Sequence, residues 1–166
     1  MSEDDEAARQ ALLDDLRAAR KLIFDALAGL PADRFEEVFL GDWSALDILA
    51  HLVGWDFTNL KAAQDILAGQ LPGFYAYHDR DWRTYNARQV TVYRRADPAA
   101  MLDSAAASHD RLMASLDTIP APDLSKDTGV RFKGVKVTLQ RLLQTEVDDE
   151  RVHAEQIRAF AGKGSD

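Results

Sequence analysis

Four stretches of the chain carry apolar residues at spacings of three and four, and this period restricts the fold more than any other feature. In residues 5–28 the apolar positions form one stripe, made of Leu12, Leu16, Ala19, Ile23 and Leu27. Such a stripe is typical of an amphipathic helix that buries one face. No stretch has a strong strand pattern, so the sequence predicts an all-α protein.

Capping residues and helix breakers set the boundaries of the predicted helices. Gly29 and Pro31 end the first helix, and Ser44 is a suitable N-cap for a second helix over residues 45–68, with Asp47 at the capping-box position. Three further helices are predicted over residues 82–94, 97–116 and 138–160.

These elements predict one domain, residues 1–166 with about 5–161 ordered, in a four-helix up-and-down bundle. A short extra helix and a long loop before the last helix complete it. Within that loop, residues 129–137 are a candidate extended piece.

Composition and charge exclude several classes of function. The chain has no cysteine, which excludes a disulfide framework, a thiolate nucleophile and a cysteine metal site. Its formal net charge is −8, and its one basic cluster, Arg131, Lys133 and Lys136, is short, so we expect no nucleic-acid partner. The start is acidic and no apolar stretch could span a bilayer, so we expect a cytoplasmic protein with no membrane partner.

Polar residues interrupt the apolar stripes of two helices. His51 shares a face of the second helix with Ile48 and Trp55, while Glu146, Asp149 and His153 take three successive stripe positions on the last helix. Burying such groups costs about 1–3 kcal/mol for a neutral group, and more for a charge, unless they are paired or bind a cation. A competing stripe would turn Glu146 and Asp149 partly outward; it consists of Leu143, Val147, Ala154 and Ile157. Periodicity does not decide between the two stripes.

Carboxylates stand four residues before two of the histidines, Asp47 before His51 and Asp149 before His153. Two histidines and a carboxylate form a ligand set expected of a catalytic zinc, iron or nickel site. The same spacing is also typical of a hydrogen-bonded pair without metal. The sequence therefore leaves open one divalent ion, zinc or nickel, or no metal. A di-iron site is disfavoured, because Glu150-x-x-His153 has no second copy.

The other two histidines have less specific surroundings. His109 lies on the apolar stripe of residues 97–116 and is predicted to be a core histidine. His78 lies in an aromatic loop, where a solvated side chain is favoured over one that lines a pocket mouth.

Residues 42–56, with the sequence DWSALDILAHLVGWD, resemble the second-helix signature of the DinB-like superfamily. The match continues through Ala68-Gly69 and residues 81–86. It returns at residues 153–157, HAEQI, which are similar to the family's last-helix segment. The spacing of Trp82, Asn86 and Tyr93-Arg94 resembles that of the ClbS/DfsB subgroup.

The resemblance implies a four-helix bundle that often carries a divalent metal on three histidines, one from the second helix and two from the last. By position these ligands fall on His51, Asp149 and His153, with aspartate where the family has histidine. Resemblance to the ClbS/DfsB subgroup instead implies chemistry without a metal.

Three functions are compatible with these features. The first is a metal-dependent hydrolase or transferase that acts on a small electrophilic molecule, with Glu146 or Glu150 as general base or as a support for the ligands. The second is a metal-free hydrolase or sequestering protein that gives resistance to a reactive metabolite. Its substrate cleft would be lined by Asp47, Trp55, Trp82 and Tyr85. The third is a non-catalytic bundle. In each case we expect a homodimer.

Overall fold

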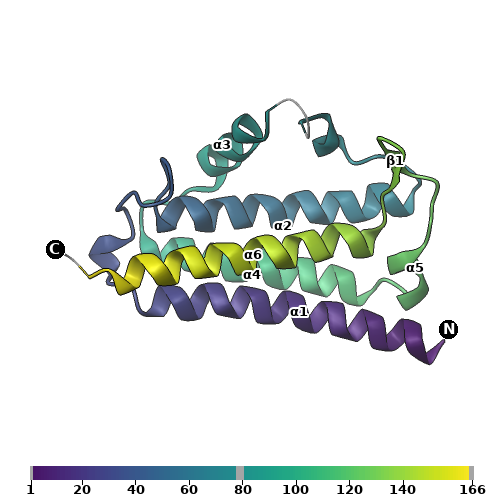
Figure 1. Cartoon of the computed structure of the whole chain (residues 1–166), viewed down its shortest axis with the longest axis horizontal. Coiled ribbons are helices and arrows are strands. Elements are labelled where there is room, and N and C mark those ends of the chain that lie inside the picture. The colour runs from purple at the N-terminus through teal and green to yellow at the C-terminus, as the bar shows by residue number, and fades with distance from the viewer. Residues whose placement is uncertain (1, 78–80, 165–166) are drawn as a thin grey trace.

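Four long helices pack side by side into a bundle: α1 (Glu3–Ala28), α2 (Ala45–Leu67), α4 (Pro98–Asp117) and α6 (Leu139–Gly162). The computed structural model describes residues 2–77 and 81–164 (Figure 1). Helices α1 and α6 run in one direction, and α2 and α4 run in the opposite direction. The predicted all-α bundle is confirmed, and each predicted helix begins and ends within two residues of its observed bounds. None of the described helices combines the length and the apolar character needed to cross a membrane.

Shorter elements connect the long helices. They are η1 (Ala32–Arg34), η2 (Gly73–Tyr77), α3 (Trp82–Tyr93), α5 (Ala121–Ser125), β1 (Arg131–Phe132) and β2 (Val135–Lys136). Helix α3 returns the chain along α2, which is why α4 starts at the same end of the bundle as α2 (Figure 1). The candidate extended piece at residues 129–137 is an antiparallel hairpin that pairs Arg131 with Lys136.

Helix α5 is not among the helices that the sequence predicts, and two prolines lie at its start. Pro120 is the N-cap of α5 and Pro122 lies in its first turn. A proline costs little there, since the first N–H groups of a helix have no intrahelical partner.

Local sequence explains how α2 is anchored at both its start and its middle. The predicted capping box is present: the Ser44 hydroxyl accepts from the Asp47 N–H, and the Asp47 carboxylate accepts from the Ser44 N–H at 2.8 Å. In mid-helix, a Cβ built on Gly54 would lie 2.6 Å from Cβ of Gln89. Only glycine therefore lets α3 pack this closely on α2, and this packing positions the residues that α3 contributes to the site.

Helix α6 buries residues of both stripes that the sequence left as alternatives, while Asp149 of the first stripe stays partly exposed. Its buried residues are Leu139, Leu142, Leu143, Glu146, Val147, Glu150, His153, Ala154 and Ile157. Glu146 and Asp149 bond side chains of α2, whereas Glu150 bonds α1. Helix α6 therefore forms polar interactions on two faces, one with α2 and one with α1.

A buried arginine joins the four long helices at their middle. The Arg20 guanidinium in α1 donates to both oxygens of Asp56 in α2, at 2.9 and 3.0 Å, and to both oxygens of Glu150 in α6, at 2.7 and 3.0 Å. It also donates to the Ala105 carbonyl of α4 at 2.8 Å, and the Ser108 hydroxyl of α4 donates to Asp56. Burial alone would lower the pKa of Arg20, but the two carboxylates raise it. The three charged groups are 0–2 % exposed, so each depends on the others for its solvation.

We predict that Arg20→Leu lowers the free energy of unfolding by about 3–5 kcal/mol, because two buried carboxylates lose their cation. The loss should shrink as the pH falls and the carboxylates take up protons. Urea unfolding at several pH values measures both effects. Arg17→Leu, at an exposed position one turn earlier, serves as the control and should cost less than about 1 kcal/mol. Equal losses in the two variants would contradict the role given to Arg20.

Candidate functional site

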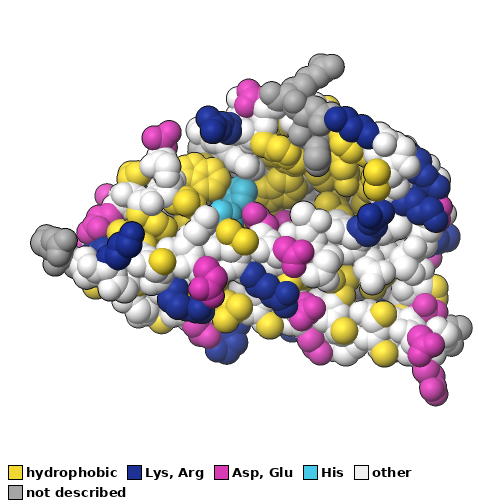
Figure 2. Space-filling view, viewed as in Figure 1, with side chains coloured by type: hydrophobic (Ala, Val, Ile, Leu, Met, Phe, Trp, Pro, Cys, Tyr) yellow, Lys and Arg dark blue, Asp and Glu magenta, His cyan; other side chains and the backbone are white. Residues whose placement is uncertain are grey.

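A cavity of about 680 Å³ lies between α2, η2, α3, the β-hairpin and the first half of α6. Figure 2 shows it as a hollow with an apolar interior, a histidine at one end and basic side chains toward the other. Its aromatic lining residues are Trp55, Phe74, Tyr75, Trp82 and Phe132. The volume is within the range of about 300–1,000 Å³ that is usual for small-molecule sites.

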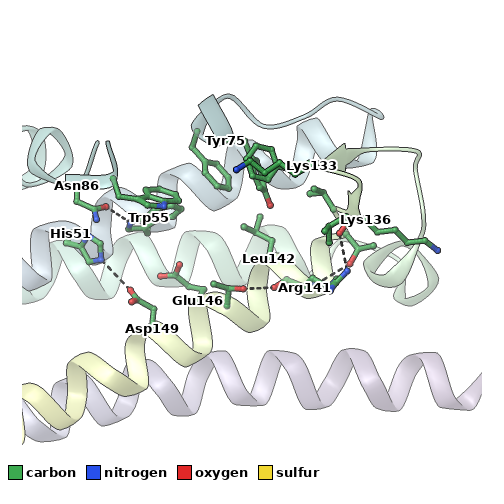
Figure 3. Close-up of a pocket in the computed structure, with 17 residues that line it drawn as sticks. His51, Trp55, Tyr75, Asn86, Lys133, Lys136, Arg141, Leu142, Glu146 and Asp149 are labelled. Carbon is green, nitrogen blue, oxygen red and sulfur yellow. Dashed lines mark hydrogen bonds and ion pairs between the residues drawn. The ribbon is translucent and has the colours of Figure 1, made fainter. Parts of the chain in front are cut away.

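His51, Asp149 and His153 meet at one end of this cavity. A single oxygen of Asp149, Oδ2, lies 3.4 Å from Nε2 of His51 and 3.4 Å from Nε2 of His153. The two imidazole rings have centroids 5.2 Å apart (Figure 3 shows His51 and Asp149). Both histidines are buried, at 4 % and 8 % exposed, while the Asp149 side chain is 46 % exposed. The group is thus held by the bundle but open to the cavity.

The three groups hold their protons differently. Burial lowers the pKa of His51 more than its bond with Asp149 raises it. Burial also acts to lower the pKa of His153, but the bond and the charge of Asp149 together raise it. Burial would raise the pKa of Asp149, yet its hydrogen bonds with His153 and His51 lower it. At neutral pH the Asp149 carboxylate therefore lies between the neutral imidazole of His51 and the imidazole of His153, which keeps its proton more readily.

Neighbouring groups orient the two imidazoles. Nδ1 of His153 lies 2.8 Å from Oε1 of Gln156, which fixes Nδ1 as the donor and leaves Nε2 to face Asp149. The ring of His51 packs against Trp43, with centroids 4.9 Å apart. Within the described part of the chain, Nδ1 of His51 has no hydrogen-bond partner.

The spacing of the three groups fits a divalent metal ion. One ligand atom from each of His51, Asp149 and His153 lies within 4.8 Å of the others. Metal–ligand bonds of about 2.0–2.1 Å at the tetrahedral angle place two ligand atoms about 3.4 Å apart. This agrees with both Asp149–histidine separations. Two imidazoles and one carboxylate, with Nδ1 of His153 held by Gln156, suit zinc or nickel once Nε2 of His153 has released its proton.

Glu146 extends the site one turn along α6. Its side chain is buried and lines the cavity, and its Oε2 accepts from the Asn59 amide at 3.1 Å. Its other oxygen has no partner among the described residues. Burial, and repulsion from Glu150 and Asp149, raise the pKa of Glu146 well above its ordinary value. A carboxyl group of this kind can hold a proton at neutral pH.

The chain matches the DinB superfamily over residues 15–157. The chain belongs to the DinB superfamily. A search of curated proteins found no match. Among solved structures, this DinB protein is similar to the crystal structure of the colibactin self-resistance protein ClbS in complex with a dsDNA. The TM-score is 0.63 at 15 % identity, and the likeness covers 93 % of this chain and 92 % of that chain, which shows a shared fold.

This likeness corrects one expectation. We expected no nucleic-acid partner on the ground of net charge, but a protein of this fold was crystallised with double-stranded DNA. Net charge was a poor criterion, because a local basic surface can attract phosphates on an acidic protein. In this chain, Lys133, Lys136 and Arg141 lie together at one end of the cavity (Figure 3).

The other predicted site residues have different positions. Trp55 and Trp82 line the cavity, with ring centroids 5.4 Å apart. Tyr85 bonds Thr58 at 2.7 Å and lines a separate groove between α2 and α3. Asp47 does not line the cavity; besides capping α2, it accepts from Arg94 at 2.8 Å. Glu150 is also outside the cavity lining, with both oxygens bonded to Arg20.

Several cavity residues were not predicted as site residues. Asn59 positions Glu146, and Asn86 accepts from the Trp55 indole at 3.1 Å. Asn86 follows Trp82 by one helical turn, a spacing that could have placed it beside the predicted pocket residues. Lys133 and Lys136 had a signal in the basic cluster of the sequence, which we set aside as too short, and Arg141 follows them closely in the chain.

His109 lies in a second group of potential ligands, with Asp56 and Glu150. Arg20 already supplies the cation there, so this group does not fit a metal ion. His109 is buried, and burial together with the charges of Arg20 and Arg17 lowers its pKa to about 3. These observations agree with the predicted core position, but neither ring nitrogen of His109 has a hydrogen-bond partner among the described residues. His78 lies outside the described residues.

We predict that, in metal-free protein, His153 titrates above 6.5 and His51 below it, as measured by NMR of the imidazole protons. Asp149→Asn should lower the pKa of His153, because its anionic partner is removed. Since the folded-state pKa of His153 is raised, protonated His153 stabilises the fold below 6.5, and this contribution is lost as the pH rises through the folded-state value. Asp148→Asn, at an exposed neighbour, is the control. Unchanged titration of both histidines in Asp149→Asn would show that Asp149 does not hold them.

Proposed function

We propose that this DinB protein is a metal-dependent hydrolase or transferase that acts on a small electrophilic molecule. The observation that carries the proposal is the position of one Asp149 oxygen 3.4 Å from Nε2 of both His51 and His153, at the end of a cavity large enough for a small molecule. These three residues would hold the ion. When bound, a divalent ion would act as a Lewis acid and lower the pKa of a bound water.

In this proposal Glu146 moves a proton. Its unpartnered Oε1 is available to a ligand in the cavity, while Asn59 holds Oε2 in place. Because its pKa is raised, the carboxyl group can donate a proton to a leaving group and accept one in the reverse direction near neutral pH. Glu150, bound to Arg20, keeps a structural role.

The aromatic wall orients the substrate and limits access of water. Trp55 lies between the histidine end and the rest of the wall, with its indole held by Asn86. Its ring contacts those of Phe74 and Trp82, with centroids 5.3 and 5.4 Å away. Such rings favour a flat or apolar substrate body.

A metal-free hydrolase or sequestering protein is the second candidate. The observation that favours it is the completeness of the His51–Asp149–His153 group without an ion, since Asp149 bonds both rings. The likeness in fold to the colibactin self-resistance protein ClbS is in keeping with it. A homodimer and a cytoplasmic location remain predictions.

Metal titration combined with turnover tests the proposal. Calorimetry should detect one zinc or nickel ion per chain in the parent, and none in His51→Ala, since a ligand is lost. Glu146→Gln should bind the ion normally, yet lose about 10²–10⁴-fold in turnover of a panel of activated esters and epoxides. Added zinc should raise turnover by the parent protein.

The matched control is Asp148→Ala, which removes an exposed carboxylate next to Asp149 and should leave both measurements unchanged. Equal turnover with and without a chelator would favour the metal-free candidate. Failure of all electrophiles to react in the presence of bound metal would contradict the enzymatic proposal.

A further inference from the structure

The two ends of the cavity differ in charge. Asp149 and Glu146 lie at the histidine end, while Lys133, Lys136 and Arg141 line the other end (Figure 3). Apolar residues, among them Leu142, lie between the two ends. A ligand that fills the cavity therefore meets reactive polar groups, then an apolar wall, then cations.

At the basic end, the cations of Arg131, Lys136 and Arg141 outnumber the carboxylates that the structure describes beside them. Arg141 donates to the Lys136 carbonyl at 3.3 Å, and none of the described carboxylates lies within ion-pair distance of its guanidinium. Lys136 pairs with Asp127 at 3.2 Å, but Asp127 also takes two bonds from Arg131. One carboxylate thus serves two cations, which leaves a positive excess at this end.

Lys133 occupies a backbone position that lysine does not favour. It has φ +50° at the tip of the hairpin, followed by Gly134 at φ +78°. Turns with two positive φ values prefer Asn-Gly, and a lysine there carries a conformational cost. At this position, Lys133 places its ammonium group at the mouth of the cavity, 5.7 Å from the centroid of the Phe132 ring.

The geometry points to an organic anion as the ligand: an elongated molecule with an apolar, flat body and a terminal carboxylate, sulfonate or phosphate. Its anionic group binds Arg141, Lys136 and Lys133, its body packs on the aromatic wall, and its reactive end reaches Asp149 and the histidines. This inference rests on the proposed function, since it takes the histidine end as the reacting end. The net charge of −8 repels anions at long range, so the attraction must come from this local cluster.

Two fluorescent probes of similar shape test the inference. Anilinonaphthalene sulfonate carries an anionic group, and phenylnaphthylamine has the same aromatic body without it. Arg141→Gln should weaken binding of the sulfonate probe roughly fivefold or more and leave the neutral probe unchanged. Arg158→Gln, which changes the net charge equally on the same helix but outside the cavity, should change neither.

A second variant separates binding from folding. Asparagine suits the turn at position 133, so Lys133→Asn should stay folded, as a melting curve can show, while sulfonate binding falls. Equal loss of both probes in Arg141→Gln, or no loss of either, would overturn the inference. So would a short DNA duplex whose binding depends on Arg141 while the sulfonate probe does not, since the basic end would then serve nucleic acid.

Failure of this inference can be told apart from failure of the proposed function. Neither probe needs a metal, so the parent protein should bind the sulfonate equally well with added zinc and with a chelator. If the parent binds no metal but Arg141→Gln still loses the sulfonate, the anion subsite stands and only the metal-dependent chemistry fails.

Discussion

The bonds of Arg20 with Asp56 and Glu150 join α1, α2 and α6 at one level of the bundle. Charged groups removed from water this completely tolerate little displacement, because Asp56 or Glu150 loses the charge of Arg20 if its helix slides. Asp56 lies in α2 a little more than one turn after His51, and Glu150 is next to Asp149 in α6. The register that satisfies Arg20 is therefore also the register that brings His51 to Asp149 and His153.

Helix α6 makes this coupling possible because it carries polar residues on two faces. Glu150 points to α1 and completes the Arg20 network, while Glu146 and Asp149 point to α2 and the cavity. The neighbouring residues Asp149 and Glu150 thus differ in role: Glu150 stabilises the fold, while Asp149 is open to a ligand in the cavity. The raised pKa of Glu146 is a consequence, since burial and two neighbouring carboxylates act on it together.

Much of the fold could be predicted from the sequence, because the stripes and caps act locally. The His51–Asp149–His153 group was also predicted, from helical spacing and the family resemblance. The roles of Glu150, Asp47 and Tyr85 could not be derived in this way. Each depends on a partner distant in sequence, namely Arg20, Arg94 and Thr58. The basic end was misread for a different reason: Lys133, Lys136 and Arg141 are close in sequence, but the net charge of −8 was given more weight than this local cluster.

We propose above that the His51–Asp149–His153 group, which the Arg20 network keeps in register, binds a divalent metal ion. Anomalous diffraction at the zinc edge, from crystals of the parent protein grown with zinc, tests it most directly. The account predicts a peak about 2.0–2.2 Å from Nε2 of His51, Nε2 of His153 and an oxygen of Asp149. Zinc bound only at surface carboxylates, with Asp149 still bonded directly to both imidazoles, would contradict it.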